Sequence, residues 1–131
     1  MARRRSINIK GFSHGTNPTP AASRVGNILF TGGISGQDTT TGLMPDDVSE
    51  QTRLAFINMR AILAAGGADL EDIVKIEFYA KDVPAAREAI NREWIVAFPD
   101  PESRPARHIF AYELPGSMLM QCDVFAVASR D

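Results

Sequence analysis

The sequence predicts an α+β fold in which a mixed β-sheet carries two helices on one of its faces. Two segments repeat apolar residues at helical spacing, short apolar strands separate them, and the chain finishes in two further strands. The expected order is β-β-α-β-α-β-β. A chain of 131 residues suits a single domain with one core, here residues 1–131.

Two strands are expected before the first helix. Residues 6–9 follow a basic tail that lacks the apolar stretch of a secretory signal. Residues 24–31 are typical of a turn that feeds an apolar strand, and this strand stops at Gly32 and Gly33. These glycines permit a close backbone approach, either to a ligand or to another strand.

The first helix has a clear start and a clear end. Asp47 with Glu50 three residues later resembles a capping box, and Gly66-Gly67 tolerates the backbone conformation of a helix C-terminus. Between them, apolar and small residues recur at intervals of three and four. They are Val48, Thr52, Ala55, Met59, Ile62 and Leu63.

A central strand and the second helix follow. Residues 73–80 are rich in β-branched and aromatic side chains, which favours a strand. Asp82 is a suitable N-cap with Pro84 in the first turn, and the helical pattern runs until Pro99. Two helices cannot cover both faces of the sheet, so we expect the second face to meet other subunits.

The last two strands, residues 106–113 and 118–128, are expected to form a β-hairpin. Arg107 is the one arginine on an otherwise apolar strand, and a buried guanidinium needs an anion. A three-residue loop, favoured over a two-residue turn by apolar burial, would place Arg107 in a polar pocket with Gln121 and Asp123.

This register also assigns the two faces of the hairpin. His108, Phe110 and Tyr112 would lie under the helices, and Arg107 and Ile109 on the opposite face. The apolar set of the last strand would also pack under the helices. This set is Met118, Met120, Cys122, Val124 and Ala126.

Composition excludes several classes of function. Charged residues make up 23% of the chain and no long apolar run is present, so membrane insertion is not expected. The net charge of −2 disfavours nucleic-acid binding. The single cysteine, Cys122, cannot form an internal disulfide, which fits a cytoplasmic location. Two histidines and one cysteine offer no set of zinc ligands, and no cofactor is expected.

Three segments carry a resemblance to a known family. Residues 25–33, 72–82 and 104–107, in this order and spacing, resemble the RidA (YjgF-type) family of enamine/imine deaminases. The resemblance implies a chorismate-mutase-like fold, a variant of the ferredoxin-like arrangement, in a homotrimer with clefts between subunits. It also implies that Arg107 binds the substrate carboxylate and that Asn91 lies near the cleft.

Four positions depart from the family pattern. Thr19 replaces a tyrosine, Gly32 a serine and Ile109 a cysteine. Gln121 replaces the glutamate associated with the hydrolytic water, and an amide cannot accept a proton at neutral pH. Asp123 is a candidate substitute if it faces the cleft.

The leading hypothesis is a deaminase that hydrolyses a small carboxylate-bearing enamine or imine to a 2-oxo acid and ammonia. Arg107 and Gln121 would be its catalytic residues. The substrate, already held by Arg107, would also contact Thr19, Gly32, Gly33, Asn91, Ile109 and Asp123. The alternative is a protein of the same fold that binds small carboxylates without catalysis. A ribonuclease or translation inhibitor is the third, less favoured interpretation. Arg107 would have a purely structural role if it paired with Asp123 or with an acid of a neighbouring subunit.

Overall fold

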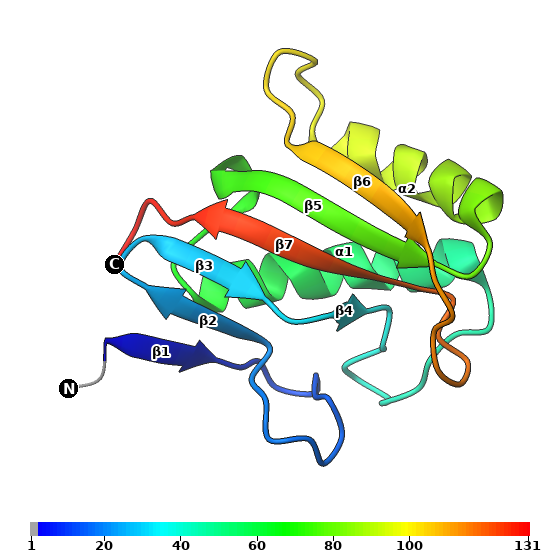
Figure 1. The fold of residues 1–131 in the computed structure, drawn as a ribbon, viewed down its shortest axis with the longest axis horizontal. Coiled ribbons are helices and arrows are strands. Elements are labelled where there is room, and N and C mark those ends of the chain that lie inside the picture. Colours follow the sequence, from blue (N-terminus) through cyan, green and yellow to red (C-terminus); the bar gives the residue numbers. More distant parts are fainter. Residues whose placement is uncertain (1–2) are drawn as a thin grey trace.

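The computed structural model describes residues 3–131, which form one mixed sheet with two helices on a single face (Figure 1). The helices are α1 (Val48–Ala65) and α2 (Val83–Ala97), with a 3₁₀ turn, η1 (Leu70–Asp72), between them. The strands are β1 (Arg4–Ile7), β2 (Ala22–Val25), β3 (Ile28–Thr31), β4 (Ile34–Ser35), β5 (Ile73–Ala80), β6 (Ala106–Ala111) and β7 (Met120–Val127).

The predicted fold class is confirmed, with more strands than expected before α1. The turn at Gly26, where φ is +58°, joins two paired strands, β2 and β3, rather than feeding one. A two-residue strand, β4, follows Gly33 and pairs with β7. The two additional strands are short, and the sequence pattern did not separate them from loops.

Both predicted helices are confirmed with their caps. The Asp47 side chain accepts a hydrogen bond from the Glu50 N–H at 3.0 Å, and Asp82 accepts one from the Ala85 N–H at 3.2 Å. These carboxylates satisfy backbone donors that have no partner within the helix. Gly66 ends α1 as expected.

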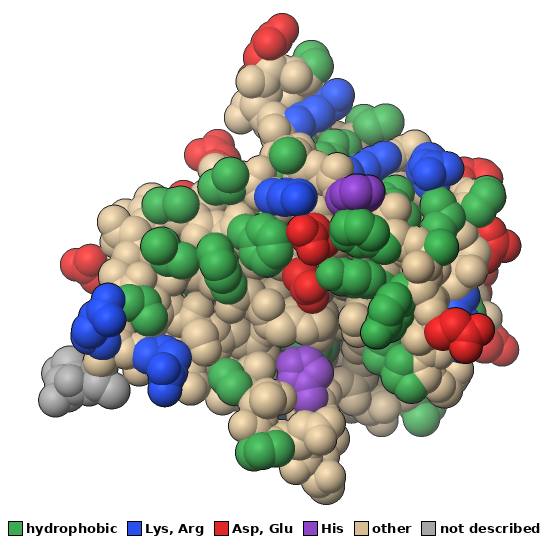
Figure 2. Space-filling model, viewed as in Figure 1, with side chains coloured by type: hydrophobic (Ala, Val, Ile, Leu, Met, Phe, Trp, Pro, Cys, Tyr) green, Lys and Arg blue, Asp and Glu red, His purple; other side chains and the backbone are tan. Residues whose placement is uncertain are grey.

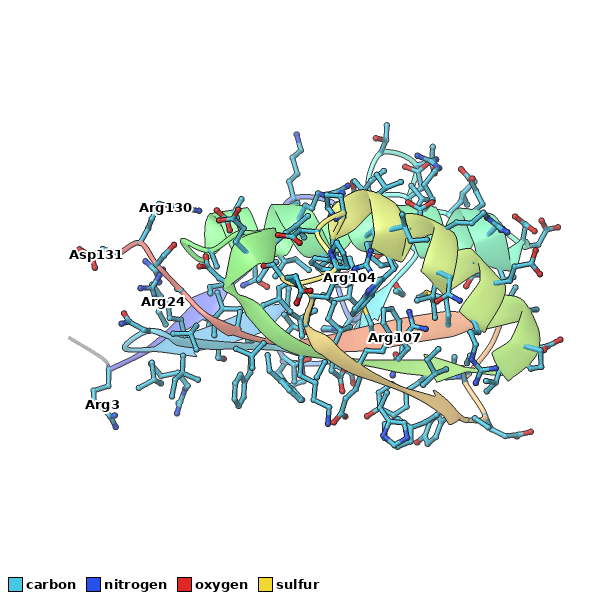
Figure 3. The ribbon with its side chains drawn as sticks, turned by 90° about the horizontal axis from the view of Figure 1, so that it is seen from above. Arg3, Arg24, Arg104, Arg107, Arg130 and Asp131 are labelled. Atoms are coloured by element: carbon cyan, nitrogen blue, oxygen red, sulfur yellow. The ribbon has the colours of Figure 1, made fainter. Side chains whose placement is uncertain are left out.

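The core lies between the helices and the sheet (Figure 3). Phe78 of β5 stacks on Phe56 of α1 and meets the Trp94 ring of α2 edge-on. Met118, which was predicted to pack under the helices, lies before β7 and is only partly buried. The other four residues of that predicted set are buried. They are Met120, Cys122, Val124 and Ala126.

The predicted hairpin of the last two strands is wrong. The strand order is β1-β2-β3-β7-β5-β6, so β5 lies between β6 and β7. β6 pairs with β5 in parallel through the α2 crossover, and β7 pairs with β5 in antiparallel orientation. A strand, crossover helix and parallel strand form a common unit, and here it takes precedence over pairing between neighbours in sequence.

The faces assigned to β6 are also reversed. Arg107 pairs with Ile76 and Ile109 with Phe78, and both partners point into the helix-covered core. Arg107 and Ile109 therefore face α2, while His108 and Phe110 lie on the other side of the sheet. The prediction placed Phe110 under the helices because it is apolar, but the other side of the sheet also carries many apolar residues.

That other side, here called the open face, carries large apolar side chains in contact with solvent (Figure 2). Exposed fractions of 51–57% are found at Ile28, Phe30, Val74, Tyr112 and Val127. Acidic side chains lie in the middle of this apolar surface. Among the described residues, no helix has the length and apolar character needed to cross a membrane.

Candidate functional site

Arg107 lies on the edge strand β6 and reaches toward α2 (Figure 3). Its Nη2 donates a hydrogen bond of 2.7 Å to Asn91 Oδ1. Its Cζ lies 5.0 Å from the centroid of the Trp94 ring, a cation–π arrangement. The guanidinium is thus held in place by a neutral amide and an aromatic face.

The electrostatics of Arg107 show a cation without a neutralising partner. Burial lowers its pKa, and the nearby positive charge of Arg87 lowers it further. An arginine remains protonated under such conditions. None of the ion pairs within residues 3–131 includes Arg107, so the predicted structural pairing with Asp123 does not form.

A second group of predicted residues surrounds the loop between β3 and β4. A Cβ atom placed on Gly33 would lie 2.8 Å from Gln121 Oε1, so the Gln121 side chain packs directly against this glycine. His14 Nε2 lies 2.8 Å from the Gly33 carbonyl oxygen. A hollow of about 300 Å³ is lined by Gly33, Gln121 and His14, together with Ser13, Asn17, Ser35, Gln37, Met44 and Met118.

Thr19 and Gly32 extend this region. They line a neighbouring open hollow that also includes His14 and Gly33. A Cβ atom on Gly32 would be 3.4 Å from the His14 ring, an ordinary van der Waals contact, so a small side chain would also fit at this position. His14 was not predicted for this site, because an isolated histidine in a loop has no spacing that indicates its contacts.

Asp123 lies elsewhere, on the open face opposite Glu77. Burial and the Glu77 charge raise its pKa, although the Tyr79 hydroxyl opposes this effect. The same environment raises the pKa of Tyr79 to about 12, and its hydroxyl donates to Glu77 Oε2 at 3.2 Å. His108 is the neighbour of Glu77 on β6.

Within one chain the predicted polar pocket of Arg107, Gln121 and Asp123 does not form. Arg107 lies on the helix side of the sheet, whereas Gln121 and Asp123 lie on the open face, because their partners Tyr79 and Glu77 alternate with core residues of β5. The structure brings together Arg107 and Asn91 on one side of the sheet. Ile109 lies two residues beyond Arg107 on that side and packs against the core.

Cys122 is confirmed as a core residue. It is completely buried, and burial raises the pKa of its thiol. A thiol of this kind is a poor nucleophile because the reactive thiolate is scarce. Within the part of the chain from residue 3 onward, no group of three or more His, Cys, Asp or Glu side chains is arranged to hold a metal ion.

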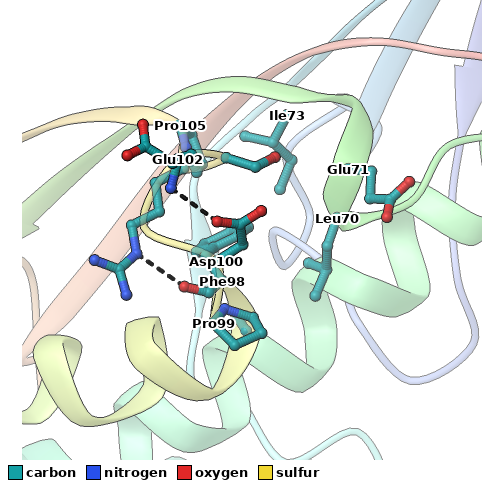
Figure 4. Close-up of a pocket in the computed structure, with 11 residues that line it drawn as sticks. Leu70, Glu71, Ile73, Phe98, Pro99, Asp100, Glu102 and Pro105 are labelled. Carbon is teal, nitrogen blue, oxygen red and sulfur yellow. Dashed lines mark hydrogen bonds between the residues drawn. The ribbon is translucent and has the colours of Figure 1, made fainter.

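A separate hollow of about 320 Å³ lies between η1 and the loop from α2 to β6 (Figure 4). Arg104 Nε donates to the Phe98 carbonyl at 2.9 Å, and the Glu102 N–H donates to Asp100 Oδ1 at the same distance. These hydrogen bonds order the loop that leads into β6. None of the predicted site residues lines this hollow.

The fold and the arginine on its edge strand define a class of small α+β proteins with two helices on one face of a mixed sheet. Residues 13–128 match the family model described as Endoribonuclease L-PSP, so the chain belongs to this family, also called YjgF/RidA. It is 34% identical over 113 residues to a RutC family protein of Pyrococcus abyssi, covering 83% of this chain and 85% of the relative.

Another relative carries a name that states an activity. A 2-iminobutanoate/2-iminopropanoate deaminase of Escherichia coli K12 is 36% identical over 81 residues, covering 57% of this chain and 63% of the relative. Among solved structures, the YjgF gene product of Escherichia coli has a TM-score of 0.81 at 27% identity, covering 94% of this chain and 98% of its own. Yeast Mmf1, with a TM-score of 0.85 at 21% identity over 96% and 99% of the two chains, shows the fold alone.

Proposed function

We propose that this protein hydrolyses a small carboxylate-bearing enamine or imine to a 2-oxo acid and ammonia. The observation that carries the proposal is the guanidinium of Arg107, which is held over Trp94 and hydrogen-bonded to the neutral Asn91. A planar guanidinium of this kind can bind a carboxylate through two parallel hydrogen bonds. The deaminase relatives support the choice of substrate.

This hydrolysis depends more on the orientation of the substrate and the water than on strong acid or base groups. In a protonated 2-imino acid the carbon of the C=N bond is electrophilic, and a water oxygen forms a bond to it while the π electrons move to nitrogen. One proton of the added water passes to the nitrogen. The carbinolamine then loses ammonia as the C–N bond breaks and the hydroxyl proton leaves, which gives the 2-oxo acid. Arg107 would hold the adjacent carboxylate and so place this carbon against the water.

Gln121 and the loop of Gly32 and Gly33 are the proposed water-binding side of the site. The Gln121 amide can hold a water by accepting or donating a hydrogen bond, but it cannot remove its proton. His14 Nε2 lies 2.8 Å from the Gly33 carbonyl oxygen, and His14 is a titratable side chain that lines this hollow. Thr19 lines the adjoining surface.

Because Arg107 and Gln121 lie on opposite faces of the sheet in one chain, a site that contains both needs two chains. We therefore propose a homotrimer in which the apolar open face of each subunit is covered by its neighbours. Exposed Phe30 and Val127 support this, since large apolar patches mark association surfaces. We also place the protein in the cytoplasm, in keeping with its single, buried cysteine.

The decisive experiment generates 2-iminobutanoate in situ with an amino-acid oxidase and measures how fast the protein releases 2-oxobutanoate. We expect acceleration by the wild type and a loss of roughly 100-fold in Arg107→Ala, the order expected for a charge-assisted pair. Arg60→Ala is the matched control, since Arg60 is an exposed arginine of α1. Equal rates for wild type and Arg107→Ala would reject the proposal.

A second candidate, a carboxylate-binding protein without catalysis, is favoured by Gln121. If wild type binds 2-oxobutanoate but accelerates no imine, this second function holds. Recovery of hydrolysis in Gln121→Glu would then identify the missing carboxylate as the cause.

A further inference from the structure

A second arginine accompanies Arg107. Arg87, Asn91 and Trp94 are spaced at i, i+4 and i+7 along α2, so they lie on one side of the helix. Asn91 and Trp94 both contact Arg107, which shows that this side is turned toward β6. Arg87 continues the same stripe by one turn toward the start of α2.

The charges of the two arginines act on one another. After burial, the positive charge of Arg87 is the second cause of the lowered pKa of Arg107. Figure 2 shows basic side chains near the outer edge of β6, with apolar and acidic side chains among them. Two neighbouring cations repel each other unless an anion lies between them.

In the described part of the chain, neither arginine forms an ion pair with an acidic side chain within 4 Å. Glu88 follows Arg87 directly in sequence, yet its carboxylate pairs with Arg92 at 3.2 Å. Both guanidinium groups are therefore available to an incoming ligand.

The spacing of Arg87 and Arg107 suits a short acid with a carboxylate at each end. Four residues of helix correspond to a rise of about 6 Å, which sets Arg87 roughly one turn from the point where Asn91 meets Arg107. Ile109 lies beyond Arg107 on the same side of β6 and offers an apolar wall to the carbon chain.

We propose that the ligand of this site is a dicarboxylate, a 2-imino or 2-oxo acid of four or five carbons whose distal carboxylate is bound by Arg87. This inference rests on the proposed function, because Arg107 is taken to hold the carboxylate beside the C=N bond. Arg87 then determines specificity, since a monocarboxylate of the same length leaves its charge unpaired.

Calorimetric titration with 2-oxoglutarate and with 2-oxopentanoate tests this, because the two acids differ only in the distal carboxylate. We expect the wild type to bind 2-oxoglutarate roughly tenfold more tightly. Arg87→Gln should bring the ratio of the two affinities close to one. Arg60→Gln, which removes an equal charge from α1, should leave the ratio unchanged.

Two results would overturn the inference while leaving the proposed function intact. One is equal affinity of the wild type for both acids, with binding of each abolished in Arg107→Ala. The other is an unchanged ratio in Arg87→Gln together with an altered sedimentation coefficient, which would assign Arg87 to a subunit contact. Binding of neither acid, with no effect of Arg107→Ala on imine decay, would instead reject the proposed function itself.

Discussion

Arg107 lies over the indole ring of Trp94, with Cζ 5.0 Å from the ring centroid, although the two residues come from different elements. Trp94 also packs edge-on against Phe78 and Phe98, and its exposed fraction is 8%. The core thus fixes the ring, and the ring fixes the guanidinium. This arrangement orients Arg107 before any ligand arrives, which lowers the entropy cost of binding.

Replacing the ring should therefore weaken ligand binding through Arg107. A cation–π contact contributes about 0.5–1 kcal/mol at a partly exposed site, so Trp94→Phe should weaken 2-oxobutanoate binding roughly twofold to fivefold. Calorimetry measures the affinity, and circular dichroism checks that the variant folds. Unchanged affinity in a folded variant would show that the ring does not orient the arginine.

Changing the amide that meets Arg107 into an acid should block the site. In Asn91→Asp a carboxylate would neutralise the guanidinium, and ligand affinity should fall roughly tenfold or more, because charged hydrogen bonds contribute about 1.5–3 kcal/mol. Asn91→Ser, which keeps a neutral polar group, is the control and should lose less. If both variants bind equally, charge on this position has no part in recognition.

Two glycines near the proposed water-binding side should respond differently to alanine. A Cβ atom on Gly36 would come within 2.1 Å of the Gln51 backbone oxygen, whereas on Gly33 it would meet the Gln121 side chain at 2.8 Å. Gly36→Ala should cost about 2 kcal/mol or more, because backbone must shift. Gly33→Ala should change stability by less than about 1 kcal/mol, since a side chain can rotate away.

Urea unfolding measures both glycine variants. Gly33→Ala should also slow imine hydrolysis, because its methyl group displaces Gln121. Comparable destabilisation of the two variants would contradict the different surroundings of these glycines.

The Asp123 carboxylate should make stability depend on pH. Burial and Glu77 raise its pKa in the folded state, so the folded protein binds this proton more tightly than the unfolded chain does. Its contribution is present below the unfolded pKa of about 3.9 and is lost as pH rises through the folded value. At pH 7 the ionised carboxylate is therefore unfavourable.

Asp123→Asn should consequently raise the melting temperature at pH 7. We expect roughly 1–2 °C, a small value because solvent still screens the carboxylate. The gain should disappear at about pH 2.5, well below the unfolded pKa of about 3.9, where Asp123 is protonated in both states. A gain that is equal at both pH values would point to packing rather than charge.

The thiol of Cys122 should be unreactive in the folded protein. It is fully buried and burial raises its pKa, so iodoacetamide should label it only after unfolding in urea. Mass spectrometry of native and unfolded samples measures this. Complete labelling of the native protein would show that β7 opens readily, and Cys122→Ala should keep imine hydrolysis at the wild-type rate.

Local features were predictable because they depend on neighbours in sequence. Asp47 and Asp82 were expected to cap the two helices, and their carboxylates accept the expected backbone hydrogen bonds. The central strand, residues 73–80, has the predicted bounds. Spacings of two and of three to four residues are properties of short segments, so the printed sequence contains them.

The candidate site was only partly predictable. Arg107 and Asn91 were singled out and do meet, and Gln121 does lie against Gly33. The predicted pocket of Arg107, Gln121 and Asp123 was wrong, because it depended on pairing β6 with β7. The contacts of His14 were missed, since they arise from a loop that folds back over Gly32 and Gly33.

The sequence by itself determined the helices with their caps, the helix-facing side of β7, and the arginine on an apolar strand. Only the tertiary structure decided that β5 separates β6 from β7 and that Arg107 faces Trp94 while Gln121 faces away. The reason is that strand order comes from contacts between residues far apart in the chain, and a strand with apolar residues on both sides does not reveal which side the helices cover.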